Sequence, residues 1–184
     1  MKKHTVQKPA FRIALCAMIA ALETVMMLLT GLVRIGTFAL PCFAGMLTVA
    51  VVIEYRCKWA FAVYAVTALL SFFLSGDKEA VIFFIALFGY YPILKNILEQ
   101  HIRSRVILYL LKFAVFNAAA VASFFAASLL LSVPAEEYSL FGVYIPYVFL
   151  AVGNVFFLLY DLTVTVFVRF YAQRLRGALF GRYL

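Results

Sequence analysis

The chain has 184 residues, of which 67% are hydrophobic and only 13% are charged, and its formal net charge is +8. A soluble domain carries about 25% charged residues, and a fold of this size has too much surface to cover with half that share. The composition therefore excludes a soluble globular protein, a disordered chain and a nucleic-acid-binding domain. It predicts an all-α integral membrane protein.

Apolar stretches in chain order predict six transmembrane helices that form a single domain over residues 1–184. About 20 apolar residues cross the hydrocarbon core as a helix. Stretches of this kind lie at approximately 10–30, 37–53, 59–74, 80–98, 106–131 and 141–168. Residues 54–58 alone join the second stretch to the third, which predicts a tight antiparallel hairpin. We expect Pro92 to bend the fourth helix because proline removes a backbone donor. That bend is either filled by neighbouring side chains or acts as a hinge.

The basic residues predict that the N-terminus and the C-terminus are both cytoplasmic. With this orientation, every Lys and Arg except Arg34 and Lys78 falls in an inner segment. Such an excess is the usual signature of cytoplasmic loops. The pattern indicates a multi-pass protein of the cell membrane, most simply the bacterial cytoplasmic membrane. The basic tail from Arg169 to Arg182 is expected to contact lipid headgroups, or to dock a cytoplasmic partner.

Polar side chains inside the spans are the candidates for function, because burying them in lipid is costly. In the last span Tyr147, Asn154 and Asp161 are spaced by seven residues and share one helix face. This face lines either a ligand cavity or an interhelical hydrogen-bond network. Asp161 lies nearer the cytoplasm, where Lys95 and Lys112 are placed at a similar depth for an ion pair.

Glu23 is a single carboxyl just past the middle of the first span. Three roles stay open for it. It is a ligand contact, a proton-linked group, or the partner of Arg34. Gly31 lies between Glu23 and Arg34 and is expected to end or bend the helix there.

Enzyme signatures are absent from the sequence. There is no GxSxG, HExxH or Walker A motif, and no cluster of histidines. We therefore expect no catalytic residues, no cofactor and no metal, and any ATP-driven work needs another chain.

Small residues form a stripe on the first span, at Ala10, Ala14, Ala17 and Ala21. Small residues four apart let a second helix approach closely. The stripe serves either internal packing or a partner.

This stripe, together with the stretch 38–48 that contains Pro41 and Gly45, resembles the substrate-binding S components of energy-coupling factor (ECF) transporters. Those are small, basic membrane proteins with six helices and cytoplasmic termini. The resemblance implies that the chain binds a vitamin or other small nutrient from the outer side. It also implies docking of the alanine stripe on a transmembrane T component, with two ATPase subunits supplying energy. The small-molecule substrate, these subunits and membrane lipids are then its partners, and nucleic acid is not.

The resemblance further implies a pocket in the outer half, lined by later helices and closed by the loop after the first span. The candidate substrate-binding residues are then Arg34, Tyr144, Tyr147, Asn154 and Glu23. A second interpretation is a non-transporting scaffold subunit of a cell-envelope complex that serves cell-wall elongation. The scaffold interpretation predicts neither a small-molecule pocket nor an ATPase partner.

Overall fold

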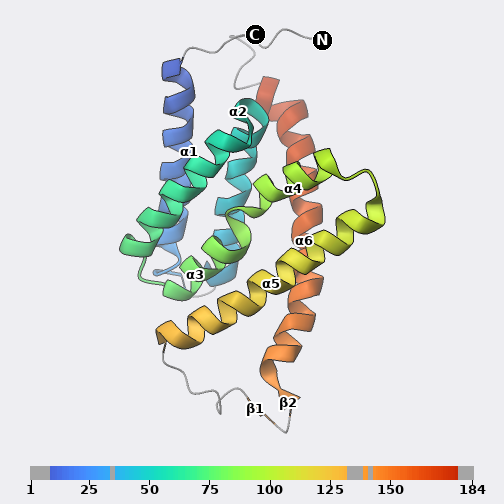
Figure 1. Cartoon of the computed structure of the whole chain (residues 1–184). Helices are drawn as coiled ribbons and strands as arrows, with labels where there is room; N and C mark the ends of the chain where they lie inside the picture. The colour runs from blue at the N-terminus through green and yellow to red at the C-terminus, as the bar shows by residue number, and fades with distance from the viewer. Residues whose placement is uncertain (1–8, 34–35, 132–138, 141–142, 178–184) are drawn as a thin grey trace.

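The computed structural model describes residues 9–33, 36–131, 139–140 and 143–177, and it is helical apart from one short hairpin (Figure 1). The elements are α1 (Pro9–Leu29), α2 (Gly36–Leu74), α3 (Lys78–Phe83), the π-helical segment η1 (Phe84–Phe88), α4 (Tyr91–His101), α5 (Arg105–Leu131), β1 (Ser139–Leu140), β2 (Val143–Tyr144), α6 (Ile145–Phe170) and the π-helical segment η3 (Tyr171–Leu175).

Five helices among the described residues are long and apolar enough to cross a membrane. They confirm the predicted all-helical architecture, and most predicted ends agree within a few residues. The last helix is an exception, because it begins at Ile145 and not at residue 141. Val143 and Tyr144 instead pair with Leu140 and Ser139 in an antiparallel hairpin. Because Val143 and Tyr144 are apolar, the sequence predicted a helix that starts before the observed one.

The longest helix, α2, is broken at Arg56, whose backbone has φ 70° and ψ 171°. Figure 1 shows the chain reversing its direction at the end of the bundle where α1 begins, so that the segments 36–55 and 57–74 are antiparallel. Val51 and Ala60, on either side of the break, are buried in the same apolar cluster. This arrangement matches the hairpin predicted between the second and third stretches.

The two sides of α1 differ in what they face. Cys16, Ile19, Ala20, Glu23 and Met27 are buried, and their clusters include residues from both halves of α2. The outward side carries exposed apolar side chains, including Ile13, Met18 and Leu22. In a membrane these outward side chains meet lipid tails.

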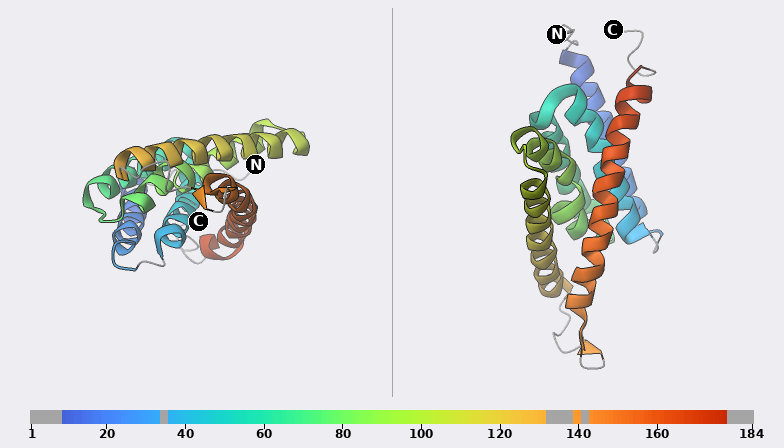
Figure 2. Two further views of the ribbon diagram at one scale, coloured as in Figure 1. Left: turned by 90° about the horizontal axis from the view of Figure 1, so that it is seen from below. Right: turned by 90° about the vertical axis from the view of Figure 1, so that its right-hand side faces the viewer.

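A second cluster lies between the N-terminal half of α2 and the elements η1, α4, α5 and α6. It is rich in aromatic rings, and Phe157 of α6 stacks on Phe116 of α5 with ring centroids 4.5 Å apart. Figure 2 shows α5 on one outer side of the bundle and α1 on the opposite side. The α2 hairpin therefore separates two regions of the interior.

Pro92 breaks the fourth apolar stretch, as predicted. Because proline has no N–H, the carbonyl of Phe88 has no helical donor four residues on. The buried hydroxyl of Tyr160 on α6 donates to this carbonyl at 3.2 Å. Gly45 of α2 packs here so closely that an added Cβ would lie 2.3 Å from the Phe88 oxygen. The gap left by the proline is thus filled by neighbouring helices.

A second carbonyl is freed on the N-terminal side of the break. The N–H of Gly89 bonds to Phe84, one residue further back than in an α-helix. The carbonyl of Ile85 instead accepts the hydroxyl of Tyr64 at 2.8 Å. Of the two alternatives for this bend, the structure favours a kink held by tyrosines from other helices over an open hinge.

Candidate functional site

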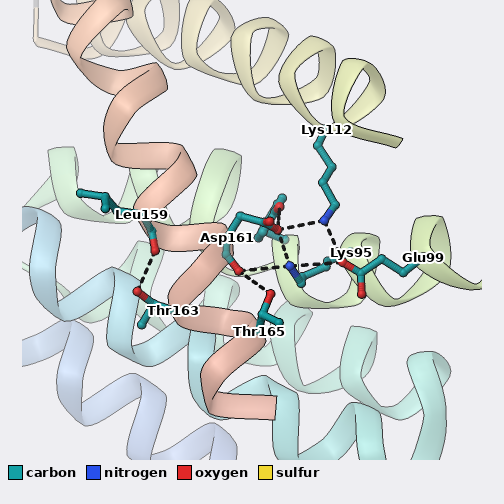
Figure 3. A network of polar contacts seen from close by, with 8 residues as sticks. Lys95, Glu99, Lys112, Leu159, Asp161, Thr163 and Thr165 are labelled. Carbon is teal, nitrogen blue, oxygen red and sulfur yellow. Dashed lines mark hydrogen bonds and ion pairs between the residues drawn. The ribbon is translucent and has the colours of Figure 1, made fainter. Parts of the chain in front are cut away.

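A cluster of charged side chains joins α4, α5 and α6 (Figure 3). Asp161 of α6 forms ion pairs with Lys95 of α4 and Lys112 of α5, and all three residues are at most 4% exposed. The Lys112 Nζ lies 3.0 Å from Oδ1 of Asp161, and the hydroxyl of Tyr91 donates to the same oxygen at 2.5 Å. The predicted pairing of Asp161 with one lysine is confirmed, and the structure pairs it with both.

Glu99 completes this cluster at its outer edge. Its Oε1 lies 3.2 Å from Nζ of Lys95 and 2.8 Å from Nζ of Lys112, and its side chain is 44% exposed. Two ammonium groups therefore face two carboxylates, and their charges balance. We call Lys95, Glu99, Lys112 and Asp161 the ion cluster.

The ion cluster is suited to holding helices together. Lys95 also donates to the backbone oxygen of Asp161 at 3.1 Å, and Thr165 donates to that oxygen at 2.8 Å. Removing one member of a buried ion pair leaves an uncompensated charge, which is strongly destabilising. The cluster therefore ties three helices to each other at the end of α4.

The second buried carboxyl, Glu23, has a different environment between α1 and the α2 hairpin. It is fully buried, its Oε1 accepts the hydroxyl of Thr48 at 2.7 Å, and its Oε2 accepts the hydroxyl of Thr67 at 2.8 Å. Thr48 and Thr67 lie on opposite halves of α2 and are also fully buried. We call these three residues the carboxyl–hydroxyl centre. Neutral donors alone stabilise its carboxyl in the described part of the chain.

The amide of Asn154 is used in a contact between α5 and α6. Its Nδ2 donates to Oδ1 of Asn117 at 3.0 Å, and the Nδ2 of Asn117 returns a bond of 2.9 Å to Oδ1 of Asn154. Each amide also donates to a carbonyl of its own helix. All four amide hydrogens are thus used. At Asn154 and Asp161 the polar face of the last helix makes the interhelical bonds that were one of its two predicted roles.

The remaining candidates for a substrate pocket are less well defined. Arg34 lies outside the described residues. Tyr144 is in β2 and Tyr147 is in the first turn of α6, and their side chains lie outside the described part. Glu23 and Asn154 lie on α1 and α6, and each bonds to its own set of neighbours. The predicted outer pocket therefore stays a prediction.

A small apolar crevice that the sequence did not reveal lies where η1, α5 and α6 meet. Its lining includes Tyr90, Val115, Phe116 and Phe156, and almost no polar surface. Within the described ranges, no group of three or more metal-binding side chains comes together.

The alanine stripe lies on the outward side of α1. Ala10, Ala14, Ala17 and Ala21 are all exposed, whereas Glu23 on the other side is fully buried. The stripe therefore does not pack inside this bundle, and it leaves a strip of small side chains on the outer surface of α1.

The sequence did not identify Thr48 and Thr67 as partners of Glu23. One signal was present, since Thr67, Ser71 and Ser75 recur every four residues and so share a helix face.

Comparison of the chain with models of protein families, with curated proteins and with solved structures finds no match to any of them.

Proposed function

We propose that the chain is the substrate-binding membrane subunit of an ECF-type importer for a vitamin or another small nutrient. In this proposal it binds its cargo from the outer side and docks on a T component that works with two ATPase subunits. The chain itself performs no catalysis.

The outward position of the alanine stripe is the observation that carries this proposal. All four alanines are exposed on α1, so their small side chains are available to a helix of another protein. Small residues on a lipid-facing surface let another helix come close, and van der Waals packing then stabilises the contact. A subunit that must dock on a second membrane protein needs such a surface.

The proposal includes six crossings with both termini in the cytoplasm. The start of α1, the break in α2 and the end of η3 lie at one end of the bundle in Figure 1, and the α2–α3 connection lies at the other. Arg56 and Lys58 are exposed at the break. This placement supports a cytoplasmic position for the basic end, following the excess of Lys and Arg there.

Cysteine labelling in intact cells tests the orientation. In a chain whose native cysteines are replaced, an impermeant thiol reagent should label Lys78→Cys directly and Lys58→Cys only after permeabilisation. The reverse pattern would place the basic end outside.

Purification from native membranes in mild detergent, with mass spectrometry of proteins and small molecules, tests the transport function. We expect a T-type membrane protein, two ATPases and one enriched metabolite. Ala14→Leu and Ala17→Leu should remove the protein partners and keep the metabolite. Ala151→Leu, at an exposed alanine of α6, is the matched control and should keep both. Docking that survives both stripe variants would exclude the stripe as the docking surface.

The scaffold function is the second candidate, and a separate observation favours it. Asn117 and Asn154 bond to each other, and Asp161 pairs with Lys95 and Lys112, so these polar groups are used in contacts between helices. A subunit that only holds partners together needs no polar cavity. Recovery of cell-envelope synthesis proteins without any metabolite would support the scaffold and contradict the importer.

A further inference from the structure

A line of buried hydroxyl groups runs along the second half of α2 and ends at Glu23. Thr67, Ser71 and Ser75 are spaced by four residues and lie one above another on one helix face. All three are buried, with at most 2% of their surface exposed. Thr67 donates to Glu23, and Ser75 donates at 3.0 Å to the carbonyl of Met27, also on α1. Because both ends of the line contact α1, the line follows the interface between α1 and α2.

Ser71 occupies the middle of this line. Its Oγ is buried and has no hydrogen-bond partner among the described residues. Buried hydroxyls nearly always have a partner, and a serine in a helix commonly uses the carbonyl four residues earlier. The donor and both acceptor sites of this hydroxyl are therefore available to a bridging water.

The line reaches the surface of the bundle at the connection between α2 and α3. The N–H of Asp77 donates to Oγ of Ser75 at 3.3 Å, and Asp77 itself is partly exposed. Its carboxylate accepts bonds from Thr37 and from the N–H of Ala80. Gly76 beside it is exposed. Ser75 is 2% exposed, and these two residues place its hydroxyl just beneath the surface at this end of the bundle.

The groups that face Glu23 are neutral. Thr48 comes from the first half of α2 and Thr67 from the second, and the phenol of Tyr160 on α6 interacts electrostatically with the carboxyl. The elements α3 and η1 contribute apolar side chains such as Ala80 and Phe84 to the cluster around Met27, one turn along α1 from Glu23. No ion pair joins Glu23 to a Lys or Arg of the described chain, so a change in its charge disturbs no salt bridge.

The geometry of this centre suits a proton better than a metal cation. The two hydroxyls bond directly to the carboxyl oxygens at 2.7 and 2.8 Å, which leaves no space for a cation among the oxygens. A proton needs no space. Protonation also removes a negative charge that is costly to keep inside a membrane without a counter-ion.

We propose that Glu23 is a proton-binding site that exchanges with water near Asp77 through the hydroxyls of Ser75, Ser71 and Thr67. On uptake, hydronium in this water gives a proton to the Ser75 hydroxyl, and each hydroxyl releases its own proton toward the next as it accepts one. The O–H bond of Thr67 breaks as an O–H bond forms on the Glu23 oxygen that it faces, so every hydroxyl is regenerated. The carboxylate loses its negative charge, and release reverses each step. Positions four residues apart in a helix are separated by about 6 Å along its axis, so a transient water bridges each step. This inference is independent of the cargo and partners proposed above.

Infrared spectroscopy of the full-length protein in vesicles of phosphatidylcholine and phosphatidylglycerol tests the site. As the pH rises, wild type should lose a carboxylic-acid C=O band, and Glu23→Gln should lack this band at every pH. Glutamine keeps the size of the side chain and an acceptor for one threonine. A wild-type band that persists unchanged in Glu23→Gln, or a wild type with no titrating band, would overturn the proposal.

Rates after a rapid pH change test the path, and they remain informative if Glu23→Gln does not fold. Ser71→Ala removes one hydroxyl and should slow the appearance of the band about tenfold, equivalent to a barrier increase of about 1.4 kcal/mol. The final amplitude should not change. Thr24→Val is the matched control, because the buried Thr24 hydroxyl bonds to Ala20 within its own helix at 2.8 Å. Equal rates in Ser71→Ala and wild type would overturn the hydroxyl path.

Discussion

The two buried carboxyl groups of this protein are stabilised by opposite means. Asp161 is 3% exposed and has two lysines around it, whereas Glu23 is fully buried and has two threonines. The ion cluster is held by charges that must all be present. The carboxyl–hydroxyl centre is held by hydrogen bonds that a neutral side chain can also make. Burial alone therefore does not tell how strongly a membrane protein depends on a particular charge.

The difference follows from where the helices bring their side chains. Lys95 lies in the middle of α4 and Lys112 in the first third of α5, the two helices that His101–Arg105 connects. Their long stems let both ammonium groups reach Asp161. Between α1 and α2 the groups that donate to Glu23 are the short hydroxyl side chains of Thr48 and Thr67. Substitutions that remove charge but keep shape should thus separate the two regions.

Removal of the Asp161 carboxylate should have the largest effect. Asp161→Ala leaves Lys95 and Lys112 buried with only the half-exposed Glu99 between them. Breaking a buried ion pair in this way costs about 3–5 kcal/mol of unfolding free energy. Denaturation in mixed detergent micelles measures this cost. Asp161→Asn should also destabilise strongly, because the amide cannot compensate either lysine.

Replacing the whole ion cluster distinguishes its charge from its packing. A variant that combines Asp161→Leu, Lys95→Met and Lys112→Met should recover much of the lost stability, since apolar residues of similar volume often replace buried ion networks without loss. If Asp161→Ala instead lowers the unfolding free energy by less than about 1 kcal/mol, the value expected for an exposed ion pair, water screens the cluster.

Changes at Glu23 should cost less and should depend on shape. Glu23→Leu leaves the hydroxyls of Thr48 and Thr67 without their acceptor, and an unsatisfied buried donor costs about 1–3 kcal/mol. Each threonine can partly recover by bonding to its own helix, so we expect about 2 kcal/mol in total. Glu23→Gln should stay within about 1 kcal/mol of wild type, because the hydrogen-bonding shape persists. The same micelle titration measures both. A glutamine variant as unstable as the leucine variant would show that the charge matters here too.

The sequence was sufficient to predict an all-helical chain with several long apolar helices, and also one of the two buried centres. Long apolar stretches have few alternatives in a membrane, so the helices and the α2 hairpin could be predicted. Asp161 could be matched with Lys95 and Lys112 because opposite charges at a similar depth in the bundle stabilise each other by forming ion pairs. The short hairpin before α6 could not be predicted, since Val143 and Tyr144 are apolar in a strand as in a helix.

The partners of Glu23 could not be predicted from the sequence. A threonine in a membrane helix commonly bonds to its own backbone, as Thr24 does, so Thr48 and Thr67 carried no distinctive signal. Their convergence depends on the angle at which the two halves of α2 pack on α1. That angle is a property of the packed bundle.

Tyr160→Phe should have a smaller effect, and it tests the boundary between the two regions. The change removes the donor to the Phe88 carbonyl, which Pro92 leaves without a helical partner. Loss of such a hydrogen bond costs about 1–1.5 kcal/mol. Tyr64→Phe, which uncaps Ile85, should cost a similar amount, while Tyr109→Phe at a 43% exposed position should cost little. Thermal unfolding in detergent compares the three. Equal stabilities would mean that water replaces the lost hydroxyls.

Arg56→Gly should have the smallest effect, and its sign should be opposite. Arg56 has φ 70° and ψ 171°, a conformation that is costly for any residue with a Cβ, by about 1–3 kcal/mol. Glycine removes this strain but adds about 0.5–1 kcal/mol of conformational entropy to the unfolded chain. The net expectation is a gain of about 1 kcal/mol, measured as a higher melting temperature. Lys58→Gly, two residues away in helical backbone, is the control and should lower stability by about 1 kcal/mol, because it adds the entropy and relieves no strain. An equal loss in both glycine variants would show that the turn at Arg56 is unstrained.

The gain should also depend on Glu23. The shared bonds of Thr48 and Thr67 to Glu23 hold the two halves of α2 in place and so maintain the strain at Arg56. In Glu23→Leu the halves can relax, so Arg56→Gly should stabilise that variant less than it stabilises wild type.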